Sequence, residues 1–430
     1  MRKTDNQIDN NEIFTFAGRH LPSYMVPATV ILLSQLPVTS NGKIDRKNLP
    51  SPVSVQKEEQ AFQPPETSIE IALANIWQDV LDLKQTRLDK HMSFFDLGGQ
   101  SFLSVRLMSK IQQQFGISLP LATLIEADTI ALLALKIQDQ QENTSADSHS
   151  PLVLLSRAAD TSPLFLIHPV GGNVLCYRDL VEQLKVLKKP VYGLQSFGIF
   201  SDQAQKDTID HLSIEDMASC YIDAMKSVQP QGPYHIGGWS MGGVLAVEIA
   251  RQLINDGNPV KRLFLIDSPA PIENDIPNET ACVKWFVRDL LGESAGWLDT
   301  DFSQQPIKWH QVLRYIIDNN LVDSDLREQD LDALYKMFVT NLTALRNYQI
   351  PQVTGVNKIL ITKANAQGIE EISAHPCGND PAWGWLAYLD NKTNDSTITV
   401  KSIPGDHYSI FSSQHLPALC QTLINWYNSQ

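Results

Sequence analysis

The 430-residue chain lacks the features of several protein classes. Its 34 basic residues are fewer than its 48 acidic ones and form no cluster, which argues against nucleic acid or an anionic membrane surface as a partner. The five cysteines include no CxxC pair, so they fit neither a disulfide framework nor a zinc site, and we expect no metal. There is no run of about 18 apolar residues and no apolar signal core, so we expect a cytoplasmic protein without membrane contact.

Two polar stretches divide the chain. At 43% hydrophobic residues it is typical of a globular protein, and its length suggests about three domains. Residues 51–65 and 141–150 have the composition of linkers. We therefore expect separate units at 1–50, 66–140 and 151–430.

The largest unit, 151–430, alternates short apolar runs with amphipathic helical patterns. This alternation predicts a parallel sheet with helices on both faces. One block, at about 270–350, has helical patterns only, and we interpret it as a lid over the edge of the sheet where ligands bind. The strands are expected near Leu152–Leu155, Leu164–His168, Val191–Leu194, Tyr234–Gly237, Leu263–Asp267, Lys358–Thr362 and Ile398–Ile403.

A nucleophile elbow is predicted within YHIGGWSMGGV, residues 234–244. Ser240 lies between an apolar strand and a helical pattern, as the GxSxG turn requires. Gly238 and Gly242 remove Cβ atoms where strand and helix crowd the turn. Since a serine hydroxyl is a weak nucleophile alone, the elbow predicts a histidine and an acid elsewhere.

The histidine is expected after the acid, because hydrolases with this elbow use the order Ser, acid, His. We predict His407, in the turn PGDH after the final strand, from which an imidazole can reach the elbow. The other histidines in the required region are His310, His375 and His415.

The acid is predicted to be Asp267, which ends the apolar strand of LFLIDSP. It would hold His407 in the correct tautomer and stabilise the imidazolium. Asp406 is the rival, but as the sequence neighbour of His407 it should point away.

An oxyanion hole needs backbone N–H groups aimed at the developing alkoxide. Met241, directly after the nucleophile, is expected to supply one. Val170, in the loop HPVGG at 168–172, is expected to supply the other, with His168 ordering that loop.

The unit at 66–140 has the pattern of a small four-helix bundle. Ser101 follows two glycines at a helix start, where the positive end of the dipole suits a phosphodiester, although an ordinary N-cap explains the residue as well. The motif FFDLGGQSF resembles the phosphopantetheine-attachment motif of peptidyl carrier proteins, apart from Gln100 and Phe102. The resemblance implies that a phosphopantetheinyl transferase attaches phosphopantetheine to Ser101.

The motifs HPVGG, GGWSMGG, LFLIDSP and GDH, in this order, resemble the type I thioesterase domain that ends nonribosomal peptide synthetases. The resemblance implies an α/β-hydrolase fold with a helical lid. It also implies that Ser240 takes a peptidyl or aminoacyl group from the thioester on Ser101 and releases it by hydrolysis or macrocyclisation.

Residues 21–50 resemble the C-terminal end of a synthetase adenylation domain. In that family the lysine of NGKIDR, here Lys43, contacts the acyl-adenylate. Because the chain has no Gly-rich phosphate loop, we interpret 1–50 as an adenylation-domain remnant and expect upstream synthetase modules as partners.

Three other functions remain open from the sequence. The chain could be a free-standing esterase or lipase with an N-terminal helical binding module, or a non-catalytic interaction protein. Reductive release is the third, although no dinucleotide GxGxxG loop is present.

Overall fold

The computed structural model describes residues 62–83, 86–99, 101–117, 119–121, 123–142, 150–159, 162–196, 213–271, 278–291, 295–302, 306–319, 328–365, 375–389 and 397–429. The predicted adenylation-domain remnant and residues 51–61 of the linker at 51–65 lie outside these residues. The interpretation of Lys43 therefore stays a prediction.

The first described unit is helical. It contains α2 (Ser68–Val80), α3 (Ser101–Phe115), the short α4 (Thr123–Glu126) and α5 (Ile130–Glu142). A capping box starts α2: Thr67 Oγ1 accepts from Glu70 N at 3.1 Å, and the Glu70 carboxylate accepts from Thr67 N at 2.9 Å. Trp77 and Phe94 meet edge to face with ring centroids 5.2 Å apart inside the apolar core.

A seven-stranded sheet organises the second unit, in the order β1-β3-β2-β4-β5-β6-β7. Its strands are β1 (Leu152–Ser156), β2 (Leu164–Ile167), β3 (Val191–Leu194), β4 (Tyr234–Trp239), β5 (Val260–Ile266), β6 (Lys358–Ala364) and β7 (Thr397–Ile403). The prediction of an all-parallel sheet was wrong for β1, which runs antiparallel to β3. The chain between β1 and β2, residues 157–163, is too short for the crossover that would be needed to make β1 parallel to β2 and β3.

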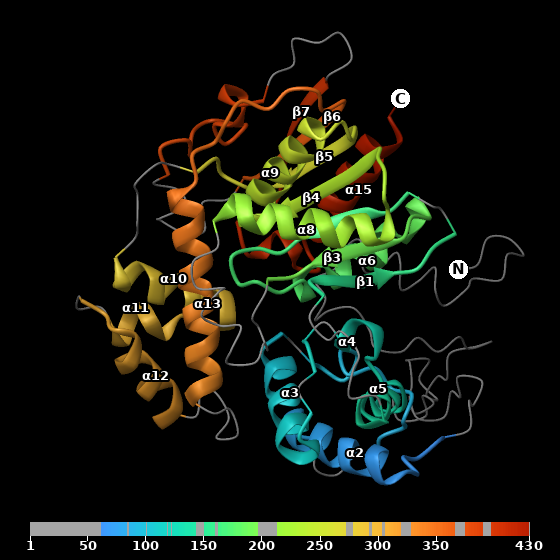
Figure 1. Cartoon of the computed structure of the whole chain (residues 1–430). Helices are drawn as coiled ribbons and strands as arrows, with labels where there is room; N and C mark the ends of the chain where they lie inside the picture. Colours follow the sequence, from blue (N-terminus) through green and yellow to red (C-terminus); the bar gives the residue numbers. More distant parts are fainter. Residues whose placement is uncertain are drawn as a thin grey trace, which may run out of the picture. The chain divides into compact units, whose positions relative to one another are not determined.

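Helices cover both faces of the sheet (Figure 1). α8 (Ile214–Val228) and α9 (Met241–Asn255) pack on one face, and α6 (Arg178–Leu184) and α15 (Leu416–Asn428) pack on the other. Every residue of β2 and β4 is buried as a result, which explains the unbroken apolar sequence of β2 and the scarcity of polar residues in β4. Short 3-10 helices lie at Leu175–Tyr177, Lys185–Leu187, Trp385–Ala387 and Ser409–Phe411.

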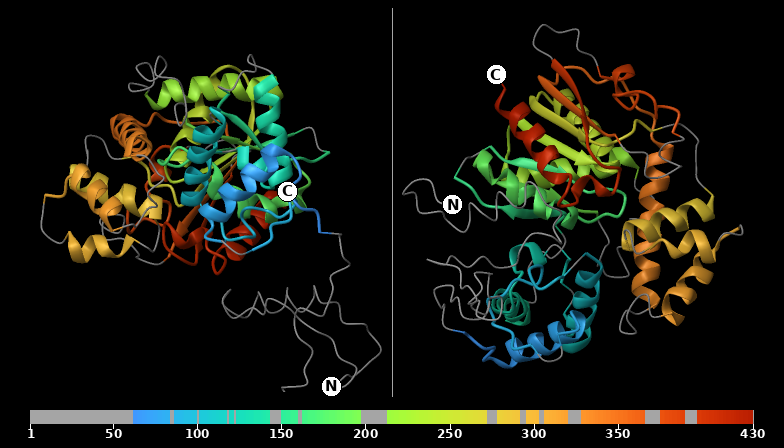
Figure 2. Two further views of the ribbon diagram at one scale, coloured as in Figure 1. Left: turned by 90° about the horizontal axis from the view of Figure 1, so that it is seen from below. Right: turned by 180° about the vertical axis from the view of Figure 1, so that it is seen from behind.

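The block between β5 and β6 is a group of helices set beside the sheet (Figure 2). Its described helices are α10 (Glu279–Leu291), α11 (Trp297–Asp301), α12 (Trp309–Asp318) and α13 (Glu328–Asn347). They share an aromatic core, in which the Phe286 ring lies 5.2 Å from Trp309 and 5.5 Å from Phe338. We call α10–α13 the lid.

Strand register brings distant loops together at the carboxyl edge of the sheet. Ile167 pairs with Gly238, so the loop after β2 lies beside the turn after β4. Trp239 pairs with Ile266, so Ser240 and Asp267 leave neighbouring strands. Within the described residues, no helix combines the length and the apolar character needed to cross a bilayer.

Candidate active site

Ser240 occupies a strained turn between β4 and α9. Its backbone has φ 56° and ψ −127°, which a residue with a side chain rarely adopts. A Cβ atom on Gly238 would lie 2.2 Å from the carbonyl of Gly242, and one on Gly242 would lie 2.2 Å from Ile167 O. The two glycines therefore permit the close approach that keeps the strand, turn and helix together.

Hydrogen bonds hold this turn on both sides of Ser240. Its N–H donates to Ile266 O at 3.1 Å, and its carbonyl accepts from Gly243 N at 3.1 Å. The Ser268 hydroxyl also donates to the Ser240 carbonyl, at 2.6 Å. The serine is thus fixed at the apex by contacts that offset its backbone strain.

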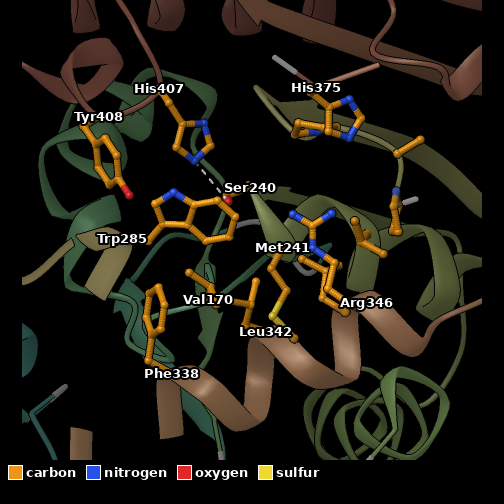
Figure 3. Close-up of a pocket in the computed structure, with 15 residues that line it drawn as sticks. Val170, Ser240, Met241, Trp285, Phe338, Leu342, Arg346, His375, His407 and Tyr408 are labelled. Atoms are coloured by element: carbon orange, nitrogen blue, oxygen red, sulfur yellow. Dashed lines mark hydrogen bonds between the residues drawn. The ribbon is translucent and has the colours of Figure 1, made fainter. Parts of the chain in front are cut away.

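His407 connects the serine with the predicted acid. Its Nε2 lies 3.1 Å from Ser240 Oγ (Figure 3). Its Nδ1 lies 2.8 Å from Asp267 Oδ2. Because an ionised carboxylate only accepts, Nδ1 carries the proton and Nε2 is free to accept from the serine. The Trp239 ring packs against the imidazole, with centroids 5.1 Å apart. This arrangement is chemically able to use Ser240 as a nucleophile, with His407 as its base and Asp267 as the acid that orients the imidazole.

Asp267 is held ionised at the end of β5. Its side chain is 1% exposed, and burial alone would raise its pKa. Hydrogen bonds from His407, from Ala364 N at 2.8 Å and from the Trp383 indole at 3.0 Å outweigh burial and lower the pKa below its usual range. The carboxylate therefore stays charged opposite the imidazole.

The rival residues have other contacts. Asp406 accepts from Tyr408 N at 3.0 Å and from Ser409 N at 2.8 Å, so it closes the turn beside the histidine. His310 lies exposed on α12, and His415 contacts Ser409 O at 3.1 Å ahead of α15. His375 lines the cavity in front of Ser240, while its Nδ1 accepts from Cys377 N.

The loop 168–172 lies against the elbow, as the strand register requires. His168 is fully buried, with Nδ1 2.6 Å from Pro169 O and Nε2 2.7 Å from Tyr221 Oη. Burial lowers its pKa to about 4, although the contact with Pro169 O opposes this shift. The imidazole is therefore neutral near pH 7 and orders the loop, away from the serine.

An apolar cavity of about 120 Å³ opens in front of Ser240 (Figure 3). Both predicted oxyanion residues, Val170 and Met241, line it. Met241 is the first residue of α9, so its N–H has no acceptor within the helix. The remaining lining residues are Val244, Pro269, Ala270, Pro271, Trp285, Phe338, Leu342, Leu345, Arg346, His375, His407 and Tyr408.

Ser101 is the first residue of α3 in the other unit. Gly98 precedes it with φ +98°, and a Cβ on Gly99 would lie 2.3 Å from the Phe94 ring, so this loop needs both glycines. The helix is fifteen residues long, and the backbone N–H groups at its start suit the phosphate of a phosphopantetheine arm. Nowhere in the described ranges do three or more His, Cys, Asp or Glu side chains gather as a metal site would require.

Several residues of the site carry no signal in the sequence. Trp383 reaches Asp267 from a segment after β6, and Tyr177 joins β2 to β4 by donating to Ile167 O at 2.6 Å and accepting from Trp239 N at 2.8 Å. Asn341 reaches the loop 168–172 from the lid. Each depends on a contact between distant segments, which no local motif encodes.

Comparison with known proteins shows which family the second unit belongs to. A family model described as a thioesterase domain matches residues 162–427. The chain belongs to this thioesterase family. A model of the phosphopantetheine attachment site matches residues 72–137, so a domain that carries phosphopantetheine covalently on a serine precedes the hydrolase domain.

Curated relatives share this order of domains over part of their length. A dimodular nonribosomal peptide synthase of Bacillus subtilis (strain 168) is 33% identical over 350 residues, which cover 80% of this chain and 14% of the synthase. Surfactin synthase subunit 3 of the same organism is 32% identical over 262 residues, covering 61% of this chain and 19% of the subunit. The chain therefore resembles a nonribosomal peptide synthetase segment and spans under a fifth of these relatives.

A solved structure of a nonribosomal peptide synthetase is also similar to this chain. The crystal structure of holo-AB3403, a four-domain nonribosomal peptide synthetase bound to AMP and glycine, matches with a TM-score of 0.55 and 29% identity. The match covers 99% of this chain and 31% of that one.

Proposed function

We propose that this chain releases a peptidyl or aminoacyl group from a carrier-bound thioester. The supporting observation is the hydrogen-bonded series Ser240, His407 and Asp267 at the mouth of an apolar cavity, in a thioesterase domain that follows a carrier domain. The domains are proposed as a helical carrier bundle at 66–140 and an α/β-hydrolase with a lid at 151–430. Upstream synthetase modules would supply the acyl chain.

Ser101 is the proposed attachment residue, modified by a phosphopantetheinyl transferase. The arm supplies a thiol that holds the acyl group as a thioester. Because a flexible linker keeps carrier and hydrolase together, the effective concentration of thioester at Ser240 is on the order of millimolar, and weak docking is sufficient.

The reaction follows from the side chains around Ser240. His407 Nε2 accepts the serine proton as Oγ attacks the thioester carbonyl, and Asp267 stabilises the imidazolium. The N–H groups of Val170 and Met241 are proposed to stabilise the oxyanion. The thiolate leaves with the proton from His407, and an acyl ester on Ser240 remains. Water, or a nucleophile of the acyl chain itself, then attacks this ester with His407 as the base, which gives the free acid or the ring.

Intact-protein mass spectrometry of the full chain tests this proposal. The protein is incubated with a phosphopantetheinyl transferase and an acyl-coenzyme A. We expect the arm on Ser101, loss of the acyl group from the wild type, and its retention by Ser240→Ala. Ser101→Ala should acquire no arm. Equal acyl loss from wild type and Ser240→Ala would overturn the proposal. Hydrolysis of soluble esters by Ser101→Ala as fast as by the wild type would favour the free-standing esterase.

A further inference from the structure

The lid touches the oxyanion loop through one buried amide. Asn341 lies on α13, the helix that also contributes Phe338 and Leu342 to the cavity. Its side chain is 2% exposed, and Nδ2 donates to Val170 O at 2.9 Å. Burying an amide without a hydrogen bond would cost free energy. The hydrogen bond to Val170 O is therefore what makes the buried position of Asn341 favourable.

The two peptide planes around Val170 are held from opposite sides. The plane with the Val170 N–H also contains Pro169 O, which lies 2.6 Å from His168 Nδ1 and accepts from Gly172 N at 2.9 Å. In a trans peptide the N–H points opposite to the C=O, so these core contacts set its direction approximately. The next plane contains Val170 O, which Asn341 holds from the lid.

Close packing around the loop brings the lid onto the same residues. A Cβ on Gly171 would lie 2.3 Å from Asp289 Oδ2 on α10, and one on Gly172 would lie 2.8 Å from Met337 Sδ on α13. Both glycines therefore permit two lid helices to approach the backbone of the loop. The loop that follows β2 is therefore in contact with the core on one side and with the lid on the other.

We propose that Asn341 is a positioning residue that aligns the Val170 N–H for the oxyanion. The inference rests on the proposed function, because it requires Val170 to be an oxyanion donor. It makes the lid part of the catalytic geometry as well as a wall of the acyl cavity. A lid held away from the loop would leave Val170 O without its donor and the adjacent N–H less well aimed.

Steady-state hydrolysis of a small acyl thioester tests this role. Asn341→Leu keeps the approximate volume and removes the amide, and Asn341→Asp keeps the shape and removes the donors. We expect kcat to fall about tenfold with KM within about twofold, because loss of a whole oxyanion donor costs about 100- to 1000-fold and misalignment costs less. Asn347→Leu, at an exposed position of the same helix, is the matched control and should behave as wild type.

An inhibitor that imitates the oxyanion separates positioning from a general structural effect. An acyl trifluoromethyl ketone adds to Ser240 and forms an oxyanion, whereas the free product acid does not. We expect the ketone to bind about tenfold more weakly to both Asn341 variants while the affinity for the acid is unchanged. Thermal unfolding of each variant checks that the fold is intact.

The possible outcomes distinguish this inference from the proposed function. Wild-type kcat in both Asn341 variants, or a change confined to KM, would overturn the role of Asn341 and leave the proposed function standing. Retention of the acyl group by the wild type would overturn the proposed function itself. Equal weakening of ketone and acid would show a structural effect and reject positioning.

Discussion

The two walls of the acyl cavity are built differently. On the sheet side, hydrogen bonds fix Ser240, Asp267 and His407. On the lid side the cavity meets mostly apolar side chains such as Phe338 and Leu342. Directional bonds define the positions of reacting atoms, whereas apolar contacts accept different shapes of similar volume. We infer that the sheet edge carries the reacting groups and that the lid, apart from the contact of Asn341 with Val170 O, selects the acyl group.

The largest effect should come from changing the acid on the sheet side. Asp267→Asn keeps the size of the side chain but favours the wrong imidazole tautomer, and we expect acyl release to slow by about 10⁴-fold. Single-turnover release from the acylated carrier measures this rate. Asp406→Asn is the matched control, since that carboxylate only bonds turn amides, and it should stay within a few-fold of wild type. Similar losses in both variants would contradict the assignment of the acid.

Acid should weaken the core support of the oxyanion loop through His168. Its pKa is about 4 in the folded protein against 6.5 ordinarily, so the unfolded chain binds more protons between these values. Stability is therefore lost as the pH falls from about 6.5 to about 4, by about 3 kcal/mol in total. Urea unfolding of wild type and His168→Gln at several pH values measures the difference. If the free energy of unfolding fell equally with pH in both proteins, His168 would not be the source of the loss.

The fold was largely predictable because burial leaves periodic patterns. The apolar runs of β2 and β4 marked central strands, and the box of Thr67 and Glu70 marked the start of α2. The direction of β1 was not predictable, since a strand sequence carries no record of its partner's orientation. The five-residue α11 is too short to leave a periodic signal in the sequence.

The site was predictable where a local turn defines it. The glycines around Ser240 and the strand end at Asp267 carry their geometry in neighbouring residues. Trp383 and Asn341 could not be found, because their roles depend on contacts with Asp267 and Val170 across long sequence distances. The sequence thus marks the proposed reacting groups better than the groups that would orient them.

Trp383→Phe should have an intermediate effect on the sheet side. It removes the indole donor to Asp267 Oδ1 but keeps an aromatic ring beneath the Lys363 ammonium, which lies 4.0 Å from the Trp383 ring centroid. A hydrogen bond to a charged group is worth about 1.5–3 kcal/mol, so we expect kcat/KM to fall about tenfold or somewhat more. Asp267 should also bind protons more readily, which moves the acid limb of the pH profile upward. Trp385→Phe, which removes a similar donor to Ser268 O, is the control and should leave that limb in place.

The smallest effect should come from the lid and should depend on the substrate. Arg346 lines the otherwise mostly apolar cavity, with its guanidinium 5.8 Å from the Trp285 ring centroid (Figure 3). A cation in such surroundings favours an acyl chain that carries a carboxylate. For Arg346→Met we expect kcat/KM to fall about tenfold for a carboxylate-bearing acyl thioester and about twofold or less for its neutral, length-matched counterpart. Lys336→Met, at an exposed position of the same helix, should change neither. Equal losses for both substrates would mean that Arg346 supports the lid and does not select the acyl group.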